Sequence, residues 1–139
     1  MSLLVVGSVA FDAIETPFGK TDKIIGGSGT FISLSASNFT KNTSLVAVVG
    51  NDFLKEDIKM LQNHGIDTEG LQIKEDEKSF FWAGRYHNDM NTRDTLVTEL
   101  NVLGTFDPII PEKYQKCEYL ILGNLSPQVQ KTVINRMHK

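Results

Sequence analysis

Three short apolar runs divide the chain and predict buried strands. They cover residues 3–6, 45–49 and 119–122, and a glycine follows each one. Each run is rich in Val, Ile or Leu and does not alternate with polar residues. Continuous apolar runs of this length are typical of parallel strands that are covered on both faces.

Helical patterns lie between and after these runs. Residues 28–39 place apolar side chains around most of a helix, which predicts a well-buried helix. A second helix is expected to be capped by Asp52 and to end at Gly65. Ser126 and Pro127 suit the N-cap and first position of a third. Strands that alternate with helices predict an α/β fold with a mostly parallel sheet.

Two segments break this rhythm. Residues 79–86 and 95–102 alternate between apolar and polar positions, and a polar loop joins them, which predicts an antiparallel hairpin. Residues 13–25 leave the first strand without an obvious helix. We expect the segments 13–25 and 79–102 to form a small β lid beside the main sheet.

The composition indicates an ordinary globular domain. The chain has 139 residues, of which 40% are hydrophobic and 22% charged, which is enough for one core. Its net charge of −3 argues against nucleic-acid binding. No apolar run reaches the roughly 18 residues that span a membrane, and the N-terminus lacks the basic region of a signal peptide. The sequence therefore predicts a soluble, cytoplasmic protein without a nucleic-acid or membrane partner.

Cysteine and histidine give no sign of a metal site. Cys117 is the only cysteine, which excludes an intrachain disulfide and a cysteine-based metal site. His64, His87 and His138 are scattered without metal-ligand spacing. No metal site is therefore predicted in this chain.

Asp12 is the first candidate for binding. It follows the first predicted strand, and open α/β sheets bind ligands at the carboxyl ends of their strands. Its carboxylate can accept two hydrogen bonds from neighbouring hydroxyls, as a sugar diol presents them. Alternatively, Asp12 caps the backbone of a turn. The residues alone do not separate these readings.

Gly26 and Gly27 open a glycine-rich segment that runs into a predicted helix. Glycines let a ligand approach the backbone, and a helix start offers free N–H groups. The alternative is a flexible turn before the helix. The segment is not a Walker A loop, because it lacks the Gly-Lys-Ser/Thr ending.

Asn124 and the predicted hairpin carry further candidates. Asn124 follows the strand at 119–122 and can face the same cleft as Asp12, although a polar turn residue is the simpler interpretation. On the hairpin, Trp82 could cover a sugar or base, while Arg93 and Asn101 could bind hydroxyls or phosphate. The alternative is a hairpin that packs its aromatic face on the core or on another subunit.

The order of these motifs resembles the N-terminal half of the ribokinase-like (PfkB-type) carbohydrate and nucleoside kinases. The chain has Gly-Ser-x-x-x-Asp at 7–12, Gly-Gly-x-Gly at 26–29, Val-Gly-x-Asp at 49–52 and Gly-Ile-Asp at 65–67. Together these motifs cover nearly the whole chain. The resemblance implies a ribokinase-like, Rossmann-type α/β fold in which residues 1–139 are the N-terminal part of one domain, so the chain is expected to be truncated.

The resemblance also implies a substrate pocket. Asp12 matches the family aspartate that binds substrate hydroxyls, and Gly26 and Gly27 match the diglycine that lines the pocket. Phe31 stands where ribokinases usually carry Asn, which favours a nucleoside or a modified sugar over ribose. The predicted substrate-binding residues are Asp12, Gly26, Gly27, Ser28, Phe31 and Asn124, with Trp82, Arg93 and Asn101 on the lid.

An intact family member would transfer the γ-phosphoryl group of ATP, with Mg²⁺, to a hydroxyl of a sugar or nucleoside. The family's Gly-Ala-Gly-Asp motif, whose aspartate is the general base, is absent from these residues. No catalytic residue is therefore predicted here, the ATP site is expected to be mostly absent, and the chain alone is expected to be inactive. A homodimer through the lid is a further expectation. The alternatives are a non-catalytic sugar- or nucleoside-binding module and a lid-mediated dimerisation unit.

Overall fold

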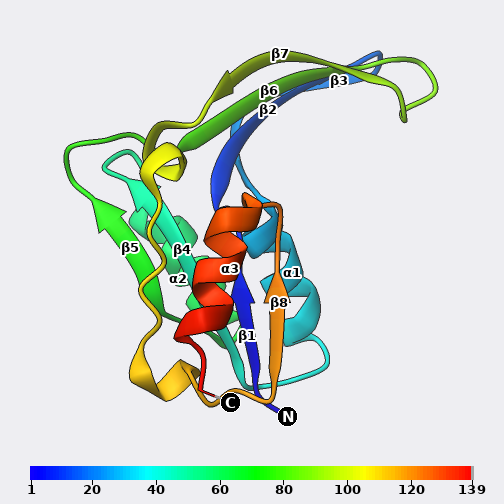
Figure 1. The fold of residues 1–139 in the computed structure, drawn as a ribbon. Coiled ribbons are helices and arrows are strands. Elements are labelled where there is room, and N and C mark those ends of the chain that lie inside the picture. Colours follow the sequence, from blue (N-terminus) through cyan, green and yellow to red (C-terminus); the bar gives the residue numbers. More distant parts are fainter. Residues whose placement is uncertain (139) are drawn as a thin grey trace.

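The computed structural model describes residues 1–138 and contains two four-stranded sheets joined at one end. The large sheet has the order β5-β4-β1-β8, and all of its strands are parallel (Figure 1). Its strands are β1 (Leu3–Val6), β4 (Thr43–Gly50), β5 (Ile66–Lys74) and β8 (Tyr119–Leu122). The predicted α/β fold with a parallel sheet is therefore confirmed.

The three apolar runs form β1, β4 and β8, but the sequence pattern did not reveal β5. The expected burial on both faces is wrong for β8, because this strand lies at the edge of the sheet and exposes Tyr119 and Ile121. Strand β5 lies at the other edge of the sheet, where Asp67, Glu69 and Gln72 reach solvent at least in part. An edge strand needs no continuous apolar run, because only part of its surface is covered. With β5 the sheet has four strands, one more than the three expected from the sequence.

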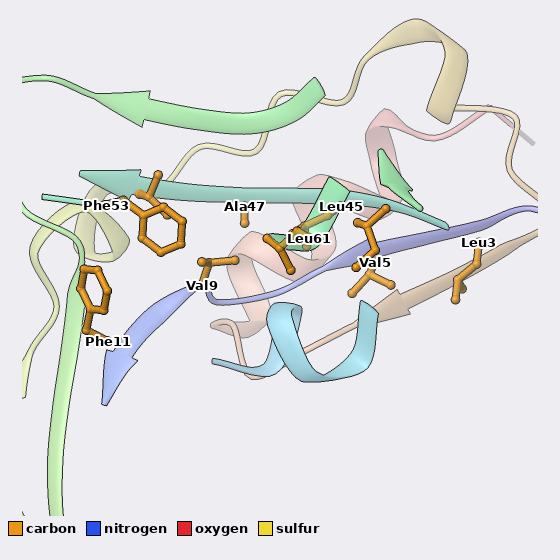
Figure 2. Packing of buried hydrophobic residues seen from close by; sticks show 10 residues of the cluster. Leu3, Val5, Val9, Phe11, Leu45, Ala47, Phe53 and Leu61 are labelled. Atoms are coloured by element: carbon orange, nitrogen blue, oxygen red, sulfur yellow. The ribbon is translucent and has the colours of Figure 1, made fainter. Parts of the chain in front are cut away.

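The large sheet is covered on both faces. Helices α1 (Ser28–Ser37) and α2 (Lys55–Asn63) pack on one face, and α3 (Pro127–Arg136) packs on the other together with the short helices η1 (Asn101–Thr105) and η2 (Glu112–Tyr114). Alternate residues of β1 pack on opposite faces of the sheet. Leu3 and Val5 lie on the face covered by α1 and α2 (Figure 2), and Leu4 and Val6 lie on the face covered by α3. Burial of each such side chain contributes roughly 1.5–3 kcal/mol.

The helix ends match two of the three predicted caps. The Ser126 hydroxyl accepts a hydrogen bond from the Val129 N–H at 3.3 Å, at the start of α3. Gly65 has a φ of +78° just after α2, as a residue beyond a helix end should. The predicted cap at Asp52 is wrong, because α2 begins after Leu54 without a side-chain cap. The Asp52 carboxylate instead contacts Ser79 and Lys23 at the junction of the two sheets.

Helix α1 is less buried than the pattern predicted. Its buried residues are the small ones, Gly29, Thr30 and Ser33, whereas Phe31 is 59% exposed and Phe39, beyond the helix end, 85% exposed. The reason is close packing: the Gly29 N–H donates to the Ser8 carbonyl at 2.8 Å. At that separation only small side chains fit between the helix and the loop after β1, so the large ones face outward.

The small sheet has the order β3-β2-β6-β7 and lies beyond the carboxyl ends of β1 and β8 (Figure 1). Its strands are β2 (Ala10–Thr16), β3 (Gly19–Gly26), β6 (Phe80–Tyr86) and β7 (Arg93–Glu99). The hairpin β6–β7 is antiparallel, as predicted, but β2 and β6 pair in parallel, so the sheet is mixed. No helix in the described part of the chain is long and apolar enough to cross a membrane.

The predicted strand at 95–102 ends early. β7 stops at Glu99, and Asn101 and Val102 belong to η1. Val102 is fully buried against the large sheet, and its N–H donates to the Lys78 carbonyl at 3.1 Å. Burial of this apolar side chain in the core thus takes precedence over the continued alternation of the strand.

Candidate functional site

A cleft of about 370 Å³ opens where the two sheets meet. It lies at the carboxyl ends of β1 and β8, which is where open α/β sheets bind ligands. Three strands and three loops contribute to its walls. The lining residues are Ser8, Asp12, Gly27, Phe80, Trp82, Tyr86, Arg93 and Asn124.

Asp12 lies within β2, between Ile24 of β3 and Trp82 of β6 in the strand register. It is therefore a strand residue and not part of a turn. Its carboxylate is half-buried and accepts no hydrogen bond from another side chain or backbone group within residues 1–138. Burial raises the pKa of this carboxyl above its ordinary value. The carboxylate is thus free to accept hydrogen bonds from a ligand.

Gly26 and Gly27 make room for this arrangement. A side chain at position 26 would overlap the Asp12 carboxylate, so Gly26 lies directly behind Asp12. Gly27 has a φ of +94°, and a Cβ there would come within 2.8 Å of the Ser8 carbonyl carbon. It precedes α1 and lines the cleft itself. The backbone therefore requires glycine at position 27, whereas glycine at position 26 leaves room for the Asp12 carboxylate.

Three polar residues connect the ends of β1 and β8 to the start of α1. The Asn124 Oδ1 accepts hydrogen bonds from the hydroxyls of Ser8, at 2.9 Å, and Ser28, at 2.6 Å. The Ser28 hydroxyl in turn accepts from the backbone N–H groups of Ser8 and Asn124, each at 3.3 Å. Within the described residues the Asn124 side-chain nitrogen donates to no protein group. Ser28 is engaged internally and orients Asn124, which faces the cleft.

An aromatic wall faces these polar groups. Phe80, Trp82 and Tyr86 are alternate residues of β6, so they share one face of the small sheet. The Trp82 indole N–H donates to the Thr95 hydroxyl of β7 at 3.3 Å, which fixes the ring. Arg93 begins β7 opposite Tyr86 and adds a guanidinium to the same wall. Such a wall suits a planar, polar ring.

The structure brings together most of the residues that the sequence singled out, but not all. Phe31 lies on the outward side of α1, in an apolar hollow that it shares with Ile121 of β8. Asn101 starts η1 with a φ of +47°, and its amide donates to the Ser79 carbonyl at 2.9 Å. Phe31 and Asn101 therefore lie outside the cleft.

The sequence interpretation did not select Ser8, Phe80 or Tyr86 as site residues. A signal was present for the two aromatics, because the alternation of β6 places them on the same face as Trp82. Ser8 lies in the Gly-Ser-x-x-x-Asp motif, two residues after the end of the apolar run. Its role becomes visible only when β8 brings Asn124 beside it.

The lining of the cleft offers few charged groups for a magnesium–nucleotide complex. Among residues 1–138 no group of three or more His, Cys, Asp or Glu side chains could hold a metal ion. In the cleft Asp12 is the only carboxylate and Arg93 the only cation. We therefore derive no reaction step through ATP or Mg²⁺ from this chain.

Two curated proteins are similar to this chain in sequence. The cytidine kinase of Thermococcus kodakarensis is 29% identical over 99% of this chain and 48% of its own length. The nucleoside kinase of Methanothermobacter thermautotrophicus is 31% identical over 76% of this chain and 44% of its own length. The chain thus spans about half the length of the curated relatives that it matches. No family model matches it.

Solved structures show the same fold. The ribokinase of Cryptococcus neoformans, solved in complex with ADP, superposes with a TM-score of 0.75 at 21% identity, over 94% of this chain and 43% of that one. The nucleoside kinase of Methanocaldococcus jannaschii, an archaeal member of the ribokinase family, also has a TM-score of 0.75, at 18% identity, over 98% and 49% of the two chains. The expected resemblance to ribokinase-like kinases is therefore confirmed.

Proposed function

We propose that this chain, which has the ribokinase-like fold, forms the acceptor-binding side of a kinase that phosphorylates a hydroxyl group of a nucleoside. The observation that carries the proposal is the unpaired Asp12 carboxylate, which shares one cleft with the aromatic wall of β6. A nucleoside combines a ribose diol with a flat base, and the cleft offers a group suited to each. The names of the two curated relatives support this choice over a plain sugar.

The polar side of the cleft would hold the ribose. Asp12 would accept hydrogen bonds from two neighbouring hydroxyls, and the Asn124 side-chain nitrogen would donate one to a ribose oxygen. Gly27 would let the sugar lie close to the backbone, because no Cβ stands in the way. These contacts orient the acceptor and leave its reactive hydroxyl to be positioned for transfer.

The aromatic side would hold the base. Trp82 is fixed by its hydrogen bond to Thr95 and offers a rigid face for stacking. Arg93 could donate to a carbonyl oxygen or ring nitrogen of the base. Ribose alone would leave this wall unused, so we expect nucleosides to bind more tightly than ribose.

The phosphoryl donor side is not part of the proposal for this chain. When bound, Mg-ATP supplies the transferred phosphoryl group and the cation that neutralises its charge. The residues described here offer the acceptor side alone, and we propose that the chain by itself transfers no phosphoryl group. The small sheet would act as a lid over the acceptor, and its exposed apolar side chains, such as Phe18 and Leu96, would support pairing of two lids in a homodimer.

Isothermal titration calorimetry of the chain with cytidine, uridine, inosine and ribose tests the proposal. We expect saturable nucleoside binding and weaker binding of ribose. Asp12→Asn should weaken nucleoside binding about 10- to 100-fold, the range that a hydrogen bond to a charged group supports.

If the folded chain binds no nucleoside, the proposal is wrong. If ribose binds as tightly as the nucleosides, the site is a sugar site. Nucleoside binding without phosphorylation by the full-length protein would support a non-catalytic module.

A further inference from the structure

One acidic residue, Asp52, links the two sheets through its side chain, and its contacts point to a positioning role. We propose that Asp52 fixes the small sheet to the large one and thereby places Asp12 at the cleft. The effect on ligand binding rests on the proposed function, whereas the effect on the sheet does not.

Asp52 joins three strands with one carboxylate. It follows β4 of the large sheet by two residues. Its Oδ1 accepts a hydrogen bond from the backbone N–H of Ser79 at 2.8 Å, immediately before β6. Its Oδ2 pairs with the Lys23 ammonium of β3 at 3.3 Å. The carboxylate therefore holds two strands of the small sheet at once.

These two strands are the neighbours of the strand that carries Asp12. In the small sheet β2 lies between β3 and β6, and Asp12 pairs with Ile24 on one side and with Trp82 on the other. Fixing β3 and β6 therefore fixes β2 from both sides. A shift of the small sheet would move Asp12 and Trp82 away from Gly27 and Asn124, which belong to the other wall of the cleft.

The bond to Ser79 is the stronger of the two contacts. Ser79 is 1% exposed, so its N–H would be buried without a partner if Asp52 were absent. The Ser79 hydroxyl accepts from the Gly50 N–H at 2.9 Å, which anchors the same residue to β4. Lys23 is about half exposed, and an exposed ion pair contributes little.

Aromatic packing completes the junction but does not replace Asp52. The Phe11 and Phe53 rings lie 5.4 Å apart between their centroids (Figure 2), and the Lys23 ammonium lies 5.2 Å above the Phe11 ring. Apolar packing between the rings sets their separation less strictly than a hydrogen bond sets the position of its donor. The hydrogen bond from Ser79 is directional and sets one position. Asp52 caps no helix, so the junction is its only observed role.

The test compares Asp52→Ala with Asp52→Asn by hydrogen–deuterium exchange. Alanine removes the acceptor for Ser79, whereas asparagine keeps an oxygen in its place. We expect Asp52→Ala to speed exchange at least threefold in β2, β3 and β6 while β1 and β8 stay slow. Asp52→Asn should retain most of the protection. Asp76→Asn serves as the control, because Asp76 is exposed in the β5–β6 connection that also contains Ser79 and forms no hydrogen bond with residues 1–138.

Nucleoside binding is the second readout. Asp52→Ala should weaken binding at least fivefold, and Asp52→Asn much less, although neither substitution touches the cleft. Unchanged exchange in the small sheet, or an equal rise in both sheets, overturns the positioning role. If the alanine variant does not fold, Lys23→Met and Asp52→Asn still test the role, because the small loss of protection expected from each should fall in β2 and β3 and leave β1 unchanged; a loss that is equal in β1 overturns it. If the unmodified chain binds no nucleoside, the proposed function fails while the exchange result still stands.

Discussion

Asp12 is unusual at the level of single residues because nothing in the described chain compensates its charge. A half-buried carboxylate without a partner destabilises the folded state. The raised pKa has the same meaning: the ionised form is less favourable in the folded chain than in the unfolded one. A residue that costs stability and faces a cleft is best explained by binding.

This leads to a prediction on stability. Asp12→Asn should leave the free energy of unfolding at pH 7 unchanged or raise it, while nucleoside binding falls. The reason is that asparagine removes the unfavourable charge but keeps the shape. Urea denaturation followed by circular dichroism measures the stability. A loss of 2 kcal/mol or more, a size typical of a disrupted structural contact, would show a structural role instead.

Binding should also depend on pH through Asp12. Because the pKa of Asp12 is raised, the carboxylate takes up a proton at a pH above its ordinary value of 3.8. Affinity for a nucleoside should therefore fall as the pH is lowered from 7, with a midpoint above 3.8. Calorimetry across this range measures the fall, and the Asp12→Asn variant should lack it. The same linkage makes the fold relatively more stable as Asp12 is protonated.

Asp52 should titrate in a separate window. Burial works to raise the pKa of its carboxyl, but the Ser79 hydrogen bonds and Lys23 outweigh burial and hold the pKa below its ordinary value. Its contribution to stability is present above the unfolded-state pKa of about 3.9 and is lost as the pH falls through the lower folded pKa. The acid effect on Asp12 binding therefore precedes any release of the junction.

The paired glycines give a further prediction. Gly27→Ala should destabilise the fold by roughly 1–3 kcal/mol, since alanine is strained at a φ of +94° and would also press on Ser8. Gly26→Ala should displace the Asp12 carboxylate and weaken nucleoside binding. Gly104→Ala is the matched control, because its Cβ would meet only Leu100 at 3.6 Å. Thermal unfolding measures the stability of the three variants, and calorimetry measures their affinity for a nucleoside. If Gly104→Ala lowers stability or affinity as much as the other two substitutions do, this account is wrong.

At the level of elements, the helix caps offer opposite predictions for α2 and α3. Ser126→Ala removes the side-chain cap of α3 and should lower stability by about 1 kcal/mol. Leu54→Ser should raise it by a similar or smaller amount, because α2 starts at an exposed Leu54 with extended backbone and no side-chain cap. Urea denaturation of both variants measures the changes. A gain from Ser126→Ala would contradict the capping geometry.

The elements also show what the sequence can and cannot predict. The strands β1 and β4 were predictable because both of their faces are covered and their side chains are continuously apolar. Strand β8 was predictable from its apolar run, although it lies at one edge of the sheet with Tyr119 and Ile121 exposed. Strand β5, at the other edge, was not predictable, because polar residues interrupt its apolar positions. The burial of α1 was misjudged because its close approach to Ser8 depends on tertiary packing and selects small residues over Phe31. For the same reason the junction role of Asp52 could not be separated from a helix cap.

For the candidate site, the local motifs predicted the two sides of the cleft separately. Asp12, Gly27 and Asn124 follow apolar runs or glycine-rich turns, so strand-end reasoning could find them. The alternation in β6 indicated Trp82 and contained Phe80 and Tyr86 as well. Phe31 and Asn101 show the limit of such reasoning, because a position in sequence does not fix which way a side chain faces.

At the level of the whole molecule, the two sheets have different roles. The large sheet carries most of the core between its two helical layers, while the small sheet has exposed strands and contacts the large sheet through Asp52 and Phe11, among others. The cleft lies between them, so its shape depends on their relative position. The small sheet carries binding groups on one side, while Phe11 of β2 joins it to the core of the large sheet.

We expect the isolated chain to bind a nucleoside without transferring a phosphoryl group to it. Phosphoryl transfer requires donors and a cation around the phosphates, and residues 1–138 contain no cluster for a metal. The chain also spans about half the length of its curated relatives. With ATP, Mg²⁺ and a nucleoside, the 139-residue chain should therefore bind the nucleoside but produce no ADP above background in a coupled assay. Nucleoside-dependent ADP formation that Asp12→Asn abolishes would show that these residues catalyse transfer themselves.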